Sequence, residues 1–429
     1  MSGSFQRQHH ASSSPMTDSS RNTSAGAGSV LLQSIAADAV NWRRHLHMHP
    51  EIGFDVPDTA RFIVERLHSF GLDQVDVDVG GGVVGVLEGK QGARYGTLAL
   101  RAEMDALPIL ELNRFDHASR NVGRMHACGH DGHMAMLLAA AAFLSKHREG
   151  VGRIAFVFQP AEEGDAGARA MLEHGLVERY DITRAIALHN RPGIHDGALA
   201  LLPGPVMAAA DRITFLINAS GGHAAMPHLT ADPVVVGASI IIGCQLIVSR
   251  HVSPLQPAVL TIPVFEAGTV RNVIPPRVRL HGTLRTFNQS VRRTVHEKLR
   301  QLANAQAASH DADVQVEIEE GYPAVVNNAE TVAELSRIAE QIGFKIEPAD
   351  PMMASDDFAY IADAVPSAYA FIGNGKSAGL HEPTYDFNDA VLLKGALFWI
   401  ETSMQFQVEL GSRTSPRLAC PPTNPNKHL

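Results

Sequence analysis

The sequence predicts an α/β protein with a mostly parallel sheet, into which a smaller ferredoxin-like domain is inserted. Buried strands alternate with helices before residue 210 and again after residue 322, which is the rhythm of a parallel sheet. Residues 211–322 instead read strand, helix, strand, strand, helix, strand, the ferredoxin-like (βαββαβ) order. The length of 429 residues agrees with two domains, because single cores stop growing at about 250–300 residues.

Local patterns predict each element of the first part. Helical periodicity predicts helices over residues 29–46 and 57–70, and an Ala- and Leu-rich run predicts another over 134–144. Apolar or alternating runs predict strands at residues 75–87 (broken at Gly80–Gly82), 95–100, 152–159 and 182–188. A short helix is expected at 168–174, between the last two of these strands.

The inserted segment and the end of the chain are read in the same way. In the insert, strands are expected at residues 212–220, 258–267, 278–287 and 314–319, with helices at 232–250 and 290–310. A helix over 331–342, a strand over 367–372 and a last helix over 389–406 then restore the α/β rhythm.

These elements divide the chain into one main domain and one inserted domain. The main, metal-binding domain is expected to comprise residues 29–210 and 323–409, and the lid domain residues 211–322. Residues 1–28 are rich in Ser, Gly and His without an apolar core, so they are expected to be disordered and to be no targeting signal. The Pro-rich residues 410–429 are expected to be a tail.

Composition excludes several classes of function. A formal charge of −9 argues against a nucleic-acid or anionic-membrane partner. The longest apolar run, residues 234–248, contains Gly and polar residues and falls short of the roughly 18–20 residues that span a bilayer. Three cysteines make no disulfide framework, and Cys128 lies among ligand-type residues. We therefore expect a cytoplasmic protein without a membrane partner.

Residues 125–133, Met-His-Ala-Cys-Gly-His-Asp-Gly-His, are dense in metal-binding groups. A tight Gly-containing turn can direct Cys128 and His130 at one point. A predicted strand precedes the motif and a predicted helix follows it, so we expect the motif on a loop at the mouth of the sheet.

Further ligand-type residues follow other predicted strands. These residues are Glu162, Glu163, His189 and His381. Cysteine, histidine and carboxylate together suit zinc or a similar first-row ion. The set exceeds what one tetrahedral ion with an open position needs, so two neighbouring ions sharing a bridging water are expected.

The adjacent pair Glu162 and Glu163 suggests a division of roles. Neighbouring residues in an extended segment point opposite ways, so one carboxylate can bind metal while the other faces the open position as a general base. The residues alone do not decide which is which. The pair also fits a helix N-terminus that favours acids.

Four other polar residues are candidates on weaker patterns. Asp105 can orient a ligand histidine, although it also reads as an ordinary loop acid. His223, between small residues on the insert, can stabilise an oxyanion, although a single histidine is more often structural. Asn272 and Arg285, also on the insert, can together hold a substrate carboxylate.

Six motifs in order resemble one enzyme family. They are Leu-Arg-Ala-Glu-Met-Asp-Ala-Leu-Pro-Ile (100–109), residues 125–133, Phe-Gln-Pro-Ala-Glu-Glu-Gly (158–164), Gly-Gly-His-Ala-Ala-Met-Pro-His (221–228), Asn-Val-Ile-Pro (272–275) and Leu-His-Glu-Pro-Thr-Tyr-Asp-Phe (380–387). From about residue 35 to 407 the chain resembles the metal-dependent amidohydrolases that include hippurate hydrolases, N-acyl-amino-acid aminoacylases and auxin-conjugate hydrolases, which are related to carboxypeptidase G-type enzymes.

The resemblance implies a role for each candidate. It implies metal ligands at Cys128, His130, Glu163, His189 and His381. It makes Glu162 the general base, Asp105 the aspartate behind a ligand, and Asn272 and Arg285 the residues that meet the substrate carboxylate. His223 would stabilise the oxyanion from the lid of the partner in a homodimer.

The resemblance also implies the cofactor and the reaction. Each subunit would hold two divalent ions, manganese or zinc, with cobalt or nickel as alternatives. The reaction would cleave the amide bond of an N-acyl-amino acid. A dipeptidase or carboxypeptidase on the same scaffold is the first alternative. A metal-binding protein without catalysis and a purely structural α/β protein are the others, and intact Glu162, Asp105 and His223 argue against the former.

Three positions depart from the family pattern. Glu103 stands where the family usually has Asp, Asp356 stands where it has Glu, and Asp165 follows Gly164 where a second Gly is common. Our hypothesis is that the longer acid at 103 and the shorter acid at 356 compensate for each other across one site. It requires the two carboxylates to lie close together.

Overall fold

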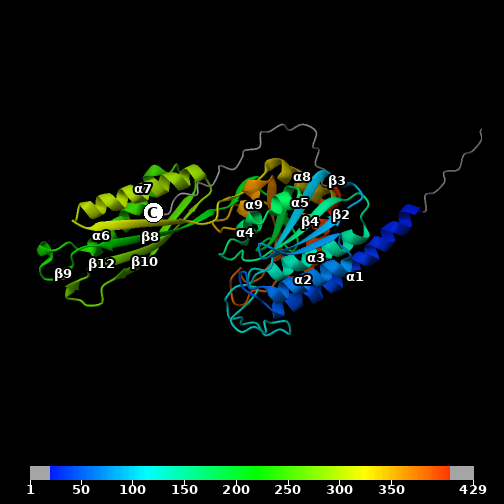
Figure 1. Ribbon diagram of the computed structural model, residues 1–429, viewed down its shortest axis with the longest axis horizontal. Helices are drawn as coiled ribbons and strands as arrows, with labels where there is room; N and C mark the ends of the chain where they lie inside the picture. The colour runs from blue at the N-terminus through cyan, green and yellow to red at the C-terminus, as the bar shows by residue number, and fades with distance from the viewer. Residues whose placement is uncertain (1–19, 406–429) are drawn as a thin grey trace, which may run out of the picture.

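The structure, a computed structural model, describes residues 20–405. Figure 1 shows an elongated molecule with the main domain at one end and the inserted lid at the other. The sequence predictions for residues 1–19 and for the tail 410–429 lie outside the described residues.

The main domain is built on a mixed sheet. Its strand order within residues 20–405 is β1-β2-β4-β3-β5-β15-β6. The strands are β1 (Gln74–Val79), β2 (Gly82–Glu88), β3 (Gly92–Glu103), β4 (Gly152–Gln159), β5 (Ile182–Pro192), β6 (Leu199–Ala200) and β15 (Ser367–Gly375). The neighbours β4, β3, β5 and β15 pair in parallel, so their carboxyl ends meet at one edge.

Helices cover both faces of this sheet. One face carries α1 (Ser20–Met48), α2 (Pro57–Phe70), α3 (His130–Lys146), α8 (Ala329–Gln341) and α10 (Leu392–Gln405), preceded by the short η2 (Asp389–Val391). The other face carries the shorter α4 (Gly167–Glu173), α5 (Leu176–Tyr180) and α9 (Phe358–Ala364). The helix α3 is buried almost throughout, which explains its Ala-rich sequence: small side chains let it pack between the sheet and the helices α1 and α10.

The lid is an antiparallel sheet covered on one face by α6 (Pro233–His251) and α7 (Gln289–Ala308). Its strands in the described chain are β8 (Ala209–Asn218), β10 (Ala258–Ala267), β12 (Arg277–Thr286) and β13 (Asp313–Glu320), in the spatial order β10-β12-β8-β13. The short β9 (Gly222–His223) and β11 (Val273–Ile274) pair at the end of the lid remote from the main domain, next to η1 (Pro227–Leu229) (Figure 1). The predicted fold class is therefore confirmed.

The helix α6 is long and apolar enough by composition to cross a membrane, with a mean hydropathy of 1.7. In this structure one face of α6 lies against the lid sheet, where Val236, Ile240 and Cys244 are buried. Its opposite face exposes Ile242 and Leu246. Such a helix has the composition of a core helix that is covered on one side only.

Two adjacent segments join the lid to the main domain. The strand β7 (Gly204–Met207) pairs antiparallel with β14 (Val325–Asn327). One step closer to the lid, the N–H of Ala210 donates to the oxygen of Tyr322 at 3.0 Å, and the N–H of Gly321 donates to the oxygen of Ala210 at 3.0 Å. The hinge is therefore a short two-stranded ribbon.

The described elements differ from the sequence predictions in three respects. The helix α1 begins at Ser20, so residues 20–28 are helical and not disordered, because extending an existing helix adds one hydrogen bond per residue without a new nucleus. Short helices such as α5 and α9 give no periodic signal and were not predicted. His130 is the first residue of α3, and His189 lies inside β5, so neither lies on a loop.

Candidate metal centre

The candidate site lies where the parallel strands end. The residues that follow β3 and β4 include Asp105, Glu162 and Glu163, while His189 lies near the end of β5. His381 comes from the loop after β15 and is fixed by a hydrogen bond of 2.8 Å from its N–H to the oxygen of Ala127. Residues distant in sequence thus meet because their strands are neighbours.

The turn that holds Cys128 and His130 requires a glycine between them. Gly129 has a φ of +87°, and a Cβ atom there would lie 2.3 Å from the side-chain nitrogen of Asn190. The backbone thus passes close to Asn190, whose side-chain N–H donates to the oxygen of Cys128 at 2.7 Å. This close approach places the thiol and the first turn of α3 at the same edge of the sheet.

The five expected ligands come together. The Cys128 sulfur lies 3.5 Å from Nε2 of His189, and Nε2 of His381 lies 3.2 Å from Oε1 of Glu163. Nε2 of His130 lies 4.0 Å from the same Glu163 oxygen. Glu163 therefore lies between one group with Cys128 and His381 and another with His130.

Hydrogen bonds fix the tautomers of two of these histidines. Nδ1 of His130 donates to the backbone oxygen of Asp105, and Nδ1 of His189 donates to the backbone oxygen of Asn190, each at 2.7 Å. A carbonyl oxygen only accepts, so each Nδ1 carries the hydrogen and each Nε2 presents a lone pair to the site. This is the usual arrangement behind a metal-bound histidine.

One buried atom tests whether these residues fit metal ions. Nε2 of His130 is buried and has no hydrogen-bond partner among residues 20–405. Unpaired buried polar atoms are costly and need an explanation. Burial also raises the pKa of the Cys128 thiol well above its usual value, so its thiolate needs a cation. The donor set fits divalent first-row ions.

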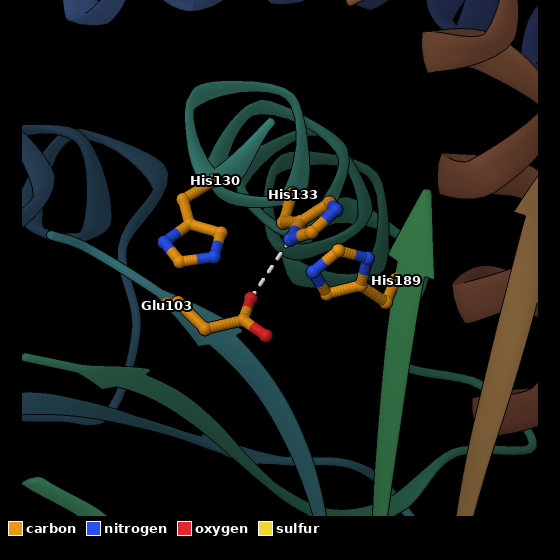
Figure 2. A group of neighbouring side chains, drawn as sticks. All are labelled: Glu103, His130, His133 and His189. Carbon is orange, nitrogen blue, oxygen red and sulfur yellow. Dashed lines mark hydrogen bonds and ion pairs between the residues drawn. The ribbon is translucent and has the colours of Figure 1, made fainter. Parts of the chain in front are cut away.

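His133 faces the same space, but both of its ring nitrogens already have hydrogen-bond partners. Figure 2 shows Glu103 pointing between His130, His133 and His189. Nδ1 of His133 lies 2.8 Å from Oε2 of Glu103, and its Nε2 accepts from the N–H of Asn190 at 2.9 Å. Both ring nitrogens are used, so His133 supports the site rather than binding an ion. The motif alone does not separate it from His130.

Glu162 is buried beside the expected ligands. Its carboxylate lies near the Glu163 carboxylate and the His130 imidazole on one side. On the other side it lies near the carboxylates of Asp356 and Asp357. Burial, followed by these neighbouring carboxylates, raises the pKa of Glu162 well above its usual value. Glu162 is therefore placed to take up a proton.

Asp105 contacts two expected ligands. Its Oδ2 accepts from the N–H of Glu163 at 3.1 Å, and its Oδ1 lies 3.7 Å from Nδ1 of His130. The atom that holds the His130 ring is the backbone oxygen of Asp105, not its carboxylate. Burial raises the pKa of Asp105 to about 6.

The departures Glu103 and Asp356 share one partner. Both carboxylates bind the buried guanidinium of Arg101, which also binds Asp357 at 3.0 Å. The hydroxyl of Tyr369 donates to Asp356 at 2.8 Å. The condition set by the compensation hypothesis, that the two carboxylates lie close together, is met.

The lid residues are not brought to this site within one chain. His223 lies on β9, and Asn272 accepts a hydrogen bond of 3.1 Å on its backbone oxygen from the N–H of Ala224. Both residues are exposed, and β9, which holds His223, lies at the end of the lid remote from the main domain (Figure 1). Arg285 lies near the opposite end of β12, in a cavity at the hinge with Gly164.

The expectation that Asn272 and Arg285 hold one carboxylate together is therefore wrong for a single chain. Most of β12 lies between them, and eight residues of extended strand span roughly 25 Å. Most of the strand predicted at residues 278–287 already lies between them in the sequence, so their separation follows from the length of that strand.

The site opens into a cavity of about 270 Å³. Apolar side chains line part of it, and sequence reasoning missed them: Met207, Met352, Phe371 and Leu380. They come from four separate segments, and only Leu380 belongs to one of the six motifs, so only the fold identifies the four as one lining. Ser355 lines both this cavity and the hinge cavity of Arg285, so the two adjoin.

Comparison with known proteins decides the family. The sequence model of peptidase family M20/M25/M40 matches residues 99–405, which is most of the chain and includes every residue of the candidate centre. The chain belongs to the M20 peptidase family. The predicted resemblance is confirmed, and so is the prediction of a metal-dependent enzyme that hydrolyses amide bonds.

Two named relatives are similar to this M20 enzyme in sequence. It is 42% identical over 299 residues to an N-acyl-L-amino acid amidohydrolase of Geobacillus stearothermophilus, covering 69% of this chain and 80% of the relative. It is 34% identical to the hippurate hydrolase of Campylobacter jejuni, covering 85% and 95%.

A solved relative shares the M20 fold and is itself described as metal-binding. The crystal structure of the Bacillus subtilis YXEP protein, described as a dinuclear metal binding peptidase of the M20 family, superposes with a TM-score of 0.78 at 30% identity, covering 87% of this chain and 98% of the relative. This likeness agrees with a ligand set too large for one ion.

Proposed function

We propose that this M20 enzyme cleaves the amide bond of N-acyl-amino acids, releasing a carboxylic acid and a free amino acid. The observation that carries the proposal is the meeting of Cys128, His130, Glu163, His189 and His381 at a partly apolar cavity that Glu162 also borders. The names of the relatives, an N-acyl-L-amino acid amidohydrolase and a hippurate hydrolase, support the same substrate class.

The five expected ligands would hold two divalent ions, which we propose are manganese or zinc, with cobalt or nickel able to replace them. Thiolate, imidazole and carboxylate donors suit these first-row ions. Such ions would polarise the scissile carbonyl and lower the pKa of the attacking water.

Glu162 would carry the proton through the reaction. It accepts a proton from the attacking water, whose oxygen forms a bond to the carbonyl carbon. When the carbon–nitrogen bond breaks, Glu162 returns that proton to the leaving amine nitrogen. A buried carboxyl group with a raised pKa can hold the proton between these two steps.

The two ends of the substrate would meet different surfaces. The apolar wall that includes Met207 and Leu380 would accept the acyl group. Arg285, in the adjoining hinge cavity, would bind the free carboxylate of the amino acid. Ser355 lines both cavities, so a substrate lying across it would reach both surfaces.

We further propose a homodimer formed through the lid. The edge strand β10 exposes Val259, Val264 and Phe265, and α6 exposes Ile242 and Leu246. An unpaired edge with apolar side chains is a surface that a second copy can cover. His223 and Asn272 of one lid would then reach the site of the other subunit, with His223 stabilising the oxyanion.

We propose a cytoplasmic location for the enzyme, with no nucleic-acid or membrane partner. A thiolate ligand at Cys128 suits a reducing compartment, and the formal charge of −9 disfavours anionic surfaces.

The test is hydrolysis of a panel of acetyl, benzoyl and indole-acetyl amino acids by metal-stripped protein refilled with manganese, zinc, cobalt or nickel. Unacylated dipeptides of matched length serve as the control substrates. We expect release of free amino acid from acylated substrates only after a metal is returned. Preference for dipeptides would replace the proposal with a dipeptidase, and no turnover with two ions bound would exclude catalysis on these substrates.

A further inference from the structure

Tyr322 joins the hinge of the lid to the loop that carries Glu162 and Glu163. Its hydroxyl donates to the backbone oxygen of Glu162 at 2.8 Å. The hydroxyl oxygen of Tyr322 also accepts from the N–H groups of Gly164 at 3.0 Å and Ala166 at 3.1 Å. The donor and both lone pairs of the phenol are thus used on one loop.

This loop adopts a backbone that needs external support. Ala161 has a φ of +55° and Ala166 a φ of +59°, in the left-handed region that residues with a Cβ rarely occupy. Such conformations persist only where surrounding contacts hold them, and they gather at functional sites. Glu162 and Glu163 lie between these two residues, so the direction of both carboxylates depends on what holds the loop.

The contacts on the other side of Tyr322 belong to the hinge. The backbone oxygen of Tyr322 accepts from the N–H of Ala210, which lies on the first segment that enters the lid. A Cβ atom on the neighbouring Gly321 would lie 2.3 Å from the oxygen of Ala210, so the two segments pass in close contact. The backbone of Tyr322 therefore belongs to the hinge ribbon, while its hydroxyl is bound to the loop of the main domain.

We propose that Tyr322 is a positioning residue for this enzyme, whose hydroxyl holds the Glu162–Glu163 loop in its working shape and ties that shape to the hinge. The inference rests on the proposed function for its kinetic consequence only. The contact itself is a property of the folded chain.

The test compares Tyr322→Phe with Tyr360→Phe. The Tyr360 ring packs edge-on against that of Tyr322 with centroids 6.0 Å apart, but Tyr360 makes no hydrogen bond to residues 162–166 in the described chain, so the control removes a hydroxyl from the same neighbourhood. Hydrogen exchange of the peptide covering residues 160–167 is measured in the metal-free proteins. Metal content, melting temperature, kcat and KM are measured in the refilled proteins.

We expect the loop amides of Tyr322→Phe to exchange at least about fivefold faster than in the wild type, because the Ala166 N–H loses its acceptor. We expect kcat to fall about tenfold or more with KM changed by less than about twofold, at unchanged metal content, since the loss is confined to the chemical step. Tyr360→Phe is expected to match the wild type in both.

Unchanged exchange in Tyr322→Phe would overturn the contact. Faster exchange with an unchanged kcat, or a loss of kcat that follows loss of metal, would overturn the positioning role. If the wild type hydrolyses no acyl-amino acid, the proposed function fails, whereas the exchange comparison still decides whether Tyr322 holds the loop.

Discussion

Glu103 and Asp356 bind the same buried guanidinium, that of Arg101, beneath the candidate metal centre. Glu103 also contacts His133, which in turn accepts from the backbone N–H of Asn190 beside His189. The lengths of these two acids therefore affect the position of a hydrogen-bond network that reaches the expected ligand His189.

Exchanging the two acids tests whether they compensate. Glu103→Asp shortens the reach to His133, and Asp356→Glu overfills a closed space, so each single variant is expected to lose about 1–3 kcal/mol of stability. The double variant is expected to recover at least about 1 kcal/mol of the summed loss, since neighbours that share a partner do not behave additively. Denaturant unfolding measures the cycle, and strictly additive losses would reject compensation.

Glu162 and Glu163 are expected to fail in different ways. Glu162→Gln keeps the shape but cannot take up a proton, so kcat should fall about 10²–10⁴-fold while two ions stay bound. Glu163→Gln removes a ligand, so it should retain less metal. Metal content by atomic absorption, measured beside kcat, distinguishes them. Retained turnover in Glu162→Gln would show that another group is the base.

Mixing two inactive variants tests whether His223 acts across a dimer. Glu162→Gln and His223→Ala are each expected to be nearly inactive. In a mixed dimer the subunit with intact Glu162 receives His223 from its partner, so random reassortment should restore about a quarter of wild-type activity, one working site in half of the dimers. Wild-type chains mixed with Glu162→Gln give the reference. No recovery after verified exchange of subunits would place His223 outside the reaction.

Asp211 predicts how the lid responds to acid. Its buried carboxylate accepts from Arg292 at 2.9 Å and faces His296 at 2.7 Å, while Glu320 lies 3.8 Å from each of those two side chains. Burial acts to raise the pKa of Asp211, but the bonds from His296 and Arg292 outweigh it and lower that pKa. A lowered pKa means stability that is present above the unfolded value of about 3.9 and lost as the pH falls through the folded value.

Asp211→Asn should therefore cost about 3 kcal/mol at pH 7, because it leaves Arg292 buried without its carboxylate. The difference from the wild type should begin to shrink below about pH 4, where the unfolded wild-type carboxylate gains a proton, and shrink further as the pH falls through the lowered pKa of the folded state. The exposed pair of Arg212 and Glu319 supplies a control: Glu319→Gln should change stability by less than about 1 kcal/mol. A difference independent of pH would contradict the assignment.

Much of this architecture was predictable because its signals are local. Several elements lie within a few residues of their predicted bounds, namely the strands β3, β4 and β15 and the helix α2. Apolar runs predict the strands directly, and Pro57 and Gly71 stand at the two ends of α2. The meeting of some expected ligands was also predictable, because Glu163 and His381 follow β4 and β15, and these strands pair in parallel with β3 and β5.

What the sequence could not predict depends on distant contacts. The hydrogen bonds that use both ring nitrogens of His133, with Glu103 and Asn190, follow only from the fold. Tyr322 lies far from any motif, and its contact with Glu162 exists only once the hinge has formed.

The position of the inserted lid in the sequence also determines the order in which the parts of a newly synthesised chain can fold. Until residues 367–375 leave the ribosome, β5 is an unprotected edge, while the whole lid has already been synthesised and can fold. His381 comes last among the expected ligands, after the lid and after β15. A fully loaded centre would therefore mark a molecule in which the lid and β15 have already been synthesised.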